Sequence, residues 1–133
     1  MVRSKGILAI ALSMPLVVVL GCGPQYDVVP VTGKVTYEGQ PVGDLIVKFS
    51  PTEGRTSEAF TAADGTFEMG YTLDEKGVEI GGHKVTVMWS PSSEDAEAPP
   101  ELVQKVLDDF EANGPIEVTI ESAQTDFEIA LPR

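Results

Sequence analysis

Apolar and polar side chains alternate with a period of two along most of the chain from residue 28 onward. Successive side chains of a strand point to opposite faces, so this alternation is typical of half-buried β-strands. Seven short strands are predicted. Their apolar positions are Val29, Val31, Gly33, Val35 and Tyr37; Leu45, Val47 and Phe49; Phe60 and Ala62; Phe67, Met69 and Tyr71; Val85, Val87 and Trp89; Ile116, Val118 and Ile120; and Phe127, Ile129 and Leu131.

Turn-forming residues separate these segments. The sequence Glu38-Gly39-Gln40-Pro41 follows the first strand, and Ala63-Asp64-Gly65 lies between the third and the fourth. Asp-Gly supplies the positive φ that a tight hairpin needs. Seven short strands with regular turn signals predict an all-β fold, a seven-stranded β-sandwich whose two inner faces carry the apolar sets.

One segment follows a different period. Between residues 99 and 110, the apolar residues 102, 103, 106, 107 and 110 recur at a spacing of three to four, and Gly114-Pro115 ends the run. This spacing predicts one short helix over about residues 100–111, inserted before the last two strands. We expect its apolar stripe to cover an edge or an open end of the sandwich.

The N-terminal segment has the pattern of a secretory signal peptide. Arg3 and Lys5 precede an uncharged run over residues 6–20, which is too short for a confident membrane span. The run ends in Val19-Leu20-Gly21-Cys22, which resembles the lipobox of bacterial lipoproteins, although Leu20 stands where that motif usually has a small residue.

The lipobox resemblance implies cleavage between Gly21 and Cys22, diacylglycerol on the Cys22 thiol, and acylation of the new amino group. The alternative is a lone thiol near a cleaved or buried apolar end. The predicted organisation is a signal peptide at 1–21, a lipidated tether at 22–27 and a β-sandwich domain at 28–133. Gly23 stands where an Asp would, in many Gram-negative lipoproteins, signal inner-membrane retention. We therefore expect an exported protein that is lipid-anchored in the cell envelope, more in the outer membrane than in the inner.

The charge of the mature chain limits its partners. After removal of residues 1–21, seven cations and twenty-one acids remain, a net charge of −14. Such a charge disfavours nucleic acid and anionic lipid surfaces, because both are polyanions. An acidic surface that keeps an exported domain soluble is the simplest interpretation.

Four motifs together resemble those of small bacterial lipoproteins with a carboxypeptidase regulatory-like, transthyretin-like domain, a type common among planctomycetes. The motifs lie at Val31–Tyr37 with Gly39 and Pro41, at Thr61–Phe67, at Gly82–Val87, and at Ile116–Ile120 with Asp126–Ile129. The resemblance implies a Greek-key sandwich that acts as a non-catalytic module. This sequence departs from the family at His83, where an aromatic residue is common, and at the predicted helix, where a loop is usual.

The sequence contains few of the residues and motifs that catalytic sites require. His83 is the single histidine, so a multi-histidine metal site is excluded, and it begins a strand on the same face as Val85 and Val87. A partly buried, hydrogen-bonded structural histidine is therefore expected rather than a general base. The sequence has no Gly-x-Ser-x-Gly elbow and no phosphate-binding glycine-rich loop. No enzyme activity and no cofactor are predicted.

Two kinds of ligand remain as alternatives. Carboxylates offer hard oxygens to Ca²⁺, although neither acidic cluster has EF-hand spacing, and solvated acids are the competing interpretation. The calcium candidates are Glu94, Asp95 and Glu97 in an acidic loop, and Asp108, Asp109 and Glu111 at the end of the helix. Trp89 and Tyr71 belong to the core or form an aromatic platform for a sugar or peptide. The leading prediction is an envelope lipoprotein whose sandwich is an interaction or structural module with a protein partner, and the alternative is calcium or carbohydrate binding.

Overall fold

The structure is a computed structural model that describes residues 27–131. Ten strands and one helix make up this part of the chain. In chain order they are β1 (Val28–Val29), β2 (Val31–Tyr37), β3 (Gln40–Pro41), β4 (Leu45–Pro51), β5 (Ser57–Phe60), β6 (Thr66–Glu68), β7 (Val78–Glu79), β8 (Gly81–Trp89), α1 (Glu101–Asn113), β9 (Ile116–Ile120) and β10 (Gln124–Leu131).

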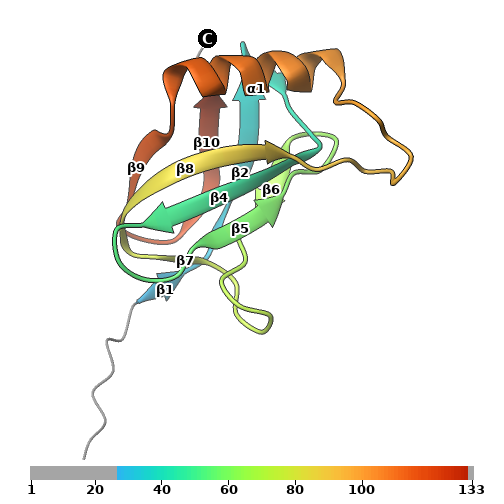
Figure 1. Cartoon of the computed structure of the whole chain (residues 1–133). Helices are drawn as coiled ribbons and strands as arrows, with labels where there is room; N and C mark the ends of the chain where they lie inside the picture. Colours follow the sequence, from blue (N-terminus) through green and yellow to red (C-terminus); the bar gives the residue numbers. More distant parts are fainter. Residues whose placement is uncertain (1–26, 132–133) are drawn as a thin grey trace, which may run out of the picture.

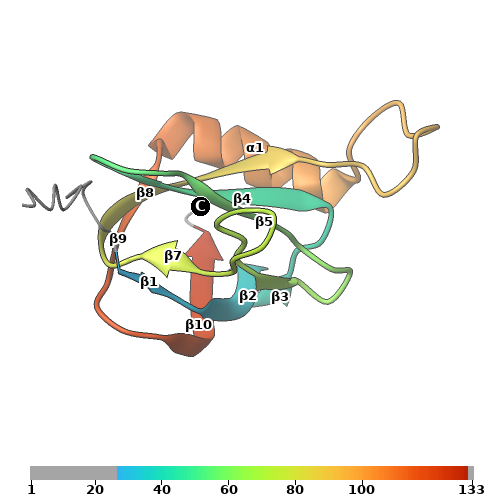
Figure 2. The same cartoon turned by 90° about the horizontal axis from the view of Figure 1, so that it is seen from below.

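The strands form two four-stranded sheets and a two-stranded ribbon. One sheet has the order β5-β4-β8-β9, all antiparallel. In the other, β2 pairs in parallel with β10 on one side and antiparallel with β3 and β6 on the other. The ribbon joins β1 to β7. Figures 1 and 2 show the two larger sheets as two layers, an arrangement consistent with an all-β sandwich. The predicted number of seven strands is not confirmed, because β1, β3 and β7 have two residues each and carry no readable period.

The hydrophobic core lies between the two larger sheets. Leu45, Val47 and Phe49 of β4 are fully buried, and β2 contributes Val31 and Val35 from the facing sheet. The same alternation buries Val85 and Val87 of β8, Ile120 of β9, and Ile129 and Leu131 of β10. The inner faces predicted for these strands are therefore confirmed.

Strand β5 has the opposite phase to the one predicted. Phe60 is 64% exposed, whereas Ala59 is 4% exposed and pairs with the buried Val47. The prediction placed Phe60 and Ala62 inside because they are apolar residues two positions apart. The core at this position instead takes the small side chains of Ser57 and Ala59, and Phe60 shares the outer face with Glu58.

The Asp64-Gly65 turn forms as predicted but joins strands of different sheets. Gly65 has a φ of +80°, and its N–H donates to the carbonyl of Ala62 at 2.8 Å. Strand β5 before this turn pairs with β4, while β6 after it pairs with β2. The turn is therefore a corner between the layers and not a hairpin within one sheet.

The helix lies along the top of both sheets in Figure 1. Pro100 stands at its N-cap, and Gly114 ends it with a φ of +78° and an N–H bond to the carbonyl of Phe110. Its buried residues, Val103 and Val106, join the core cluster, as the predicted apolar stripe requires. The position of α1, directly before β9 and β10, confirms a helix inserted before the last two strands.

Candidate functional site

The outer face of the β5-β4-β8-β9 sheet is a surface on which four strands place side chains in order. On each strand of this sheet, every second side chain points away from the core. The cross-strand register aligns these side chains into rows that run across the strands. We call this surface the outer face. Its residues are Ile46, Lys48 and Ser50 of β4, Glu58 and Phe60 of β5, Lys84, Thr86 and Met88 of β8, and Glu117 and Thr119 of β9.

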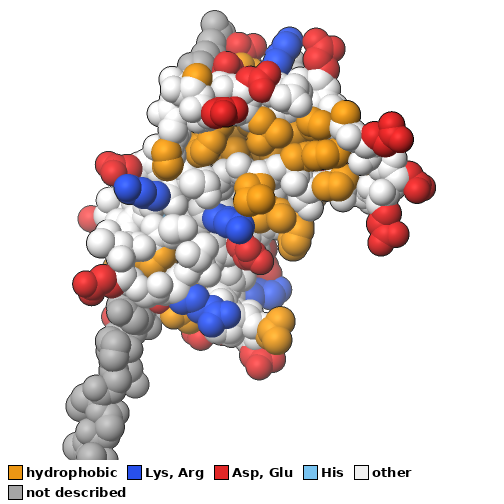
Figure 3. Space-filling view, in the orientation of Figure 1, with side chains coloured by type: hydrophobic (Ala, Val, Ile, Leu, Met, Phe, Trp, Pro, Cys, Tyr) orange, Lys and Arg blue, Asp and Glu red, His pale blue; other side chains and the backbone are white. Residues whose placement is uncertain are grey.

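An apolar row crosses three strands of the outer face. Ile46 is the register partner of both Phe60 on β5 and Met88 on β8. Phe60 is 64% exposed and Met88 is 49% exposed. Directly opposed side chains on one face of a sheet lie about 5 Å apart, so the three side chains form one continuous patch, the apolar row. Figure 3 shows apolar side chains gathered on this side of the molecule, below the helix.

Charged and hydroxyl side chains occupy the next rows. Lys48 lies opposite Glu58 and Thr86, and Lys84 lies opposite Ser50 and Glu117. Among residues 27–131, neither lysine forms an ion pair, whereas Lys76 pairs with Glu68 and Lys105 with Glu101. The polarity of the outer face therefore changes along the strands, from the apolar row to rows that carry free ammonium groups.

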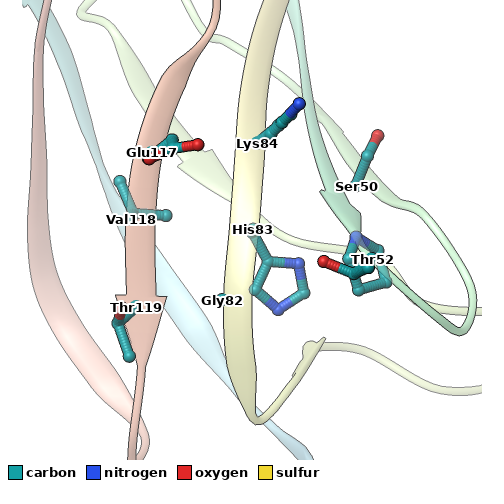
Figure 4. Close-up of a pocket in the computed structure, with 9 residues that line it drawn as sticks. Ser50, Thr52, Gly82, His83, Lys84, Glu117, Val118 and Thr119 are labelled. Carbon is teal, nitrogen blue, oxygen red and sulfur yellow. The ribbon is translucent and has the colours of Figure 1, made fainter.

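A shallow hollow of about 450 Å³ lies at the far end of the outer face from the apolar row. Gly82 is exposed, and a Cβ built on it would meet nothing within 4 Å, so the missing side chain leaves open space above the strand. Figure 4 shows Ser50, Thr52, Lys84 and Glu117 around this space. Hydroxyls, one ammonium and one carboxylate therefore share the lining of the hollow with Pro51, Val118 and His83.

A buried carboxylate lies where β7 leads into β8. Glu79 is 1% exposed, and its Oε1 accepts hydrogen bonds from the Tyr71 hydroxyl at 2.7 Å and from the backbone N–H of Arg55 at 3.0 Å. Its Oε2 has no hydrogen-bond partner among the described residues. The bond to Glu79 is the main cause that raises the pKa of Tyr71, with smaller contributions from burial and from the Glu79 charge. Sequence reasoning missed this site, because Glu79 stands between Val78 and Ile80 with no sign of burial.

His83 is the structural histidine that the sequence predicts. It is 4% exposed, packs against Phe49 with ring centroids 5.9 Å apart, and donates from Nε2 to the backbone carbonyl of Glu79 at 2.6 Å. This donation fixes the tautomer, because a carbonyl oxygen only accepts. The ring is thus held inside the fold at the border of the hollow, and its Nδ1 has no hydrogen-bond partner among the described residues.

The calcium candidates do not form a cluster. Glu94, Asp95 and Glu97 are exposed on the loop after β8. On the helix, Asp109 accepts a hydrogen bond from the Tyr37 hydroxyl and Asp108 accepts one from Gln104, so both carboxylates have partners within the fold. Glu111 is exposed in the last turn of α1. Within residues 27–131, no three acidic, histidine or cysteine side chains come together as a metal site.

Trp89 and Tyr71 do not form one aromatic platform. Trp89 ends β8 and packs, partly buried, against the core, as expected. Tyr71 binds Glu79, which precedes the first residue of the same strand. Because β8 has nine residues, its two ends lie about 27 Å apart. The two aromatic rings therefore belong to opposite ends of the sheet.

The lipidation and cleavage residues, Cys22 and Gly21, lie outside the described residues, as does the predicted signal peptide. Within residues 27–131, no helix has the length and the hydrophobicity that a membrane span requires.

No protein-family model matches this sequence, and comparisons with curated proteins and with solved structures give no significant match.

The apolar row was also missed at the level of sequence, although a signal was present. Phe60 shares its face with Glu58, Ile46 with Lys48, and Met88 with Lys84. A large apolar side chain in phase with a charge on the same strand indicates exposure. The alignment of the three in one row depends on the register between strands, which no single strand encodes.

Proposed function

We propose that this protein is a lipid-anchored lipoprotein of the cell envelope whose β-sandwich is a non-catalytic interaction module. The observation that carries the proposal is the apolar row. Three large apolar side chains stand in register on an otherwise polar face, two of them about half exposed or more. Contiguous apolar surface with a polar rim is typical of a protein contact site. The outer face is therefore the surface through which the module acts.

The anchor is supported by the sequence. Two cations, an uncharged run and the lipobox-like Val19-Leu20-Gly21-Cys22 occur in the order that lipoprotein export needs. One acyl chain gives weak and reversible attachment, whereas the three chains implied by the lipobox hold a protein on the membrane. We expect an outer-membrane rather than an inner-membrane location, on the basis of Gly23.

The finer fold assignment is part of this proposal. A Greek-key sandwich needs a strand that returns by a long connection to lie beside an earlier one. The antiparallel pairing of β8 with β4 is of this kind, which supports the resemblance to the carboxypeptidase regulatory-like, transthyretin-like domains. A non-catalytic role is supported by the burial of His83, the single histidine.

The anchor is tested by replacing its cysteine. Full-length protein and Cys22→Ser are compared by membrane fractionation and by intact mass. Retention of the full-length protein on membranes, with the mass of three acyl chains, and release of Cys22→Ser support the proposal. An unmodified thiol at Cys22 in membrane-extracted protein contradicts it.

The contact surface is tested by removing the apolar row. Phe60→Ser and Met88→Ser are compared with Ile80→Ser, a matched control that is 44% exposed and follows β7, away from the outer face. Cross-linking of the tagged, full-length protein in cells should give discrete adducts that are lost in the first two variants and kept in the third. Equal loss or equal retention in all three contradicts a role for the row.

A further inference from the structure

Exposed apolar side chains occur at the end of the domain where the chain enters it. Asp27 is the first described residue, and its carbonyl accepts a hydrogen bond at 2.8 Å from the N–H of Ile80, which follows β7. Figures 1 and 2 show β1, β7 and the loop between β6 and β7 together at one end of the molecule, opposite α1. We call this part, which comprises residues 27–29 and 70–80, the tethered end.

We infer that the tethered end lies on the bilayer that holds the lipid anchor, with the side chains of Leu73 and Ile80 among the lipids. The inference rests on the proposed anchor at Cys22 and adds a second contact between the protein and the membrane. Four large apolar side chains of the described domain are exposed. Phe60 and Met88 belong to the apolar row, and Leu73 and Ile80 are the other two. The exposed apolar surface is therefore divided between the outer face and the tethered end.

The loop that carries Leu73 is held next to the first strand. A bridge joins Gly70 to Lys76, so the chain reverses between them and Leu73 lies at the tip. The side chain of Leu73 is 104% exposed, which means that it packs against nothing in the described fold. At the base of the loop, a Cβ on Gly77 would lie 2.4 Å from the backbone carbonyl oxygen of Val29 in β1. Leu73 therefore projects from a loop that contacts the strand at which the tether ends.

The tether keeps the domain close to the bilayer. Residues 22–26 separate the proposed lipidated cysteine from the first described residue, and a chain of this length spans at most about 17 Å. Strand β8 alone is about 27 Å long, since it has nine residues. The tether is therefore shorter than the domain, and the tethered end is the surface that it holds nearest to the lipids. A short tether also makes the contact intramolecular, with an effective concentration in the millimolar range.

Weak attraction between the domain and the lipids is enough under these conditions. Transfer of one fully exposed leucine side chain from water into an apolar phase favours the contact by about tenfold or more. Ile80 is 44% exposed and adds a smaller factor. Asp74 and Glu75 are exposed next to Leu73, and their charges must stay in water. Insertion is therefore shallow and reaches only the boundary between the headgroups and the acyl chains.

The distribution of charge favours the same orientation. Residues 90–113, which form α1 and the loop before it, carry seven acids and one cation. The loop at residues 71–76 carries two acids and one cation. Anionic headgroups therefore repel the helix end of the domain more strongly than the tethered end. In this orientation Met88 of the apolar row lies about 23 Å along β8 from Gly81, so the row stays available to a protein partner.

A photoactivatable lipid identifies the residues that touch the bilayer. Full-length acylated protein is reconstituted into phosphatidylcholine vesicles in which some lipids carry a diazirine on the acyl chain near the headgroup. After irradiation and digestion, the lipid adducts are located by mass spectrometry. We expect adducts at residues 71–80 to be about tenfold more frequent than adducts at Phe60 or Met88, which are exposed apolar controls in the same protein.

The outcomes of this experiment separate the contact from the anchor. Attached protein whose adducts are confined to other surfaces, or which has none on residues 27–131, overturns the inference and leaves the proposed anchor standing. Protein that carries no acyl chains and stays in solution contradicts both.

A substitution tests the leucine itself. Leu73→Ser removes a side chain that has no contact in the fold, so the variant should stay folded in urea denaturation and remain on the vesicles through its acyl chains. Adducts at residues 71–80 should nevertheless fall about tenfold. Phe60→Ser is the matched control and should label like the wild type. Equal labelling of all three proteins, or equal loss in both variants, overturns the inference.

Discussion

The Tyr71 hydroxyl donates a 2.7 Å hydrogen bond to Oε1 of Glu79, a carboxylate that is 1% exposed. The backbone N–H of Arg55 donates to the same oxygen, and Gly54 passes so close that a Cβ on it would lie 2.0 Å from Oε2. A buried charge is tolerated only with hydrogen-bond donors around it. Glu79 therefore connects the segment before β5 with the segment that leads into β7, at the end of the sheet opposite the apolar row.

Removal of the Tyr71 hydroxyl should destabilise the fold. Tyr71→Phe leaves the buried carboxylate with one donor fewer, and we expect the free energy of unfolding to fall by about 1–3 kcal/mol. Urea denaturation of the wild type and the variant measures the loss. The same substitution in a Glu79→Gln background should cost less, because a neutral amide accepts a weaker bond. An equal cost in both backgrounds would show that the bond to the carboxylate is not the cause.

The close approach of Gly54 to Glu79 gives a second test with a built-in control. Gly54 has a φ of +117° and Gly81 a φ of +131°, so alanine strains the backbone at both positions. Around Gly81 nothing lies within 4 Å, whereas at Gly54 the new methyl group would displace the Glu79 carboxylate from its donors. We expect Gly54→Ala to lower the free energy of unfolding by about 1–3 kcal/mol more than Gly81→Ala does. Equal losses in thermal or urea denaturation would contradict the packing around Glu79.

The long strands and the helix were predictable because each buries one face along its whole length. In β4, Leu45, Val47 and Phe49 are buried, and the alternation alone reveals this. The three-to-four spacing of α1 predicts its buried Val103 and Val106 in the same way. Burial of a whole face imposes a period on a single segment, so the segment can be interpreted without its neighbours.

Features that depend on contacts between distant segments were not predictable. The phase of β5 is set by its pairing with β4, which leaves room inside for Ala59 and not for Phe60. Burial of Glu79 depends on donors from Tyr71 and Arg55, eight and twenty-four residues away in the sequence. The apolar row likewise exists only through the register of three strands. The sequence therefore contains the residues of the candidate site, but their arrangement depends on contacts between strands that the sequence does not reveal.

The parallel pairing of β2 with β10 should depend on Gly33. A Cβ at this position would lie 1.8 Å from the backbone carbonyl oxygen of Phe127, its register partner. Gly33→Ala should therefore push the two strands apart and lower the free energy of unfolding by about 3 kcal/mol or more. Gly82→Ala is the matched control, since it lies in β8 with no atom within 4 Å. It should be neutral or stabilising by about 0.5 kcal/mol, because glycine is disfavoured within a strand. Similar losses in both variants would contradict the close approach of β2 and β10.

The corner between the two sheets should lose stability in acid. Asp64 accepts bonds from the side-chain hydroxyl and the backbone N–H of Thr66, at 2.6 Å and 3.1 Å, and these bonds hold the pKa of Asp64 below its usual value of 3.8. Because the pKa is lower in the folded chain than in the unfolded chain, the carboxylate stabilises the fold above pH 3.8. This stabilisation is lost as the pH falls through the folded value.

Substitutions at Thr66 test whether its hydroxyl is the cause of this acid dependence. Thr66→Val removes the hydroxyl donor and should move the pKa of Asp64 towards 3.8, whereas Thr66→Ser keeps the donor and should leave the pKa low. The side-chain carboxyl of Asp64 is followed by ¹³C NMR titration in each variant, and Asp64→Asn identifies its signal by absence. A pKa that is unchanged in Thr66→Val would contradict the hydroxyl as the main cause. If the pKa of Asp64 rises in Thr66→Val and not in Thr66→Ser, the Thr66 hydroxyl is the group that preserves the stability of this corner to lower pH.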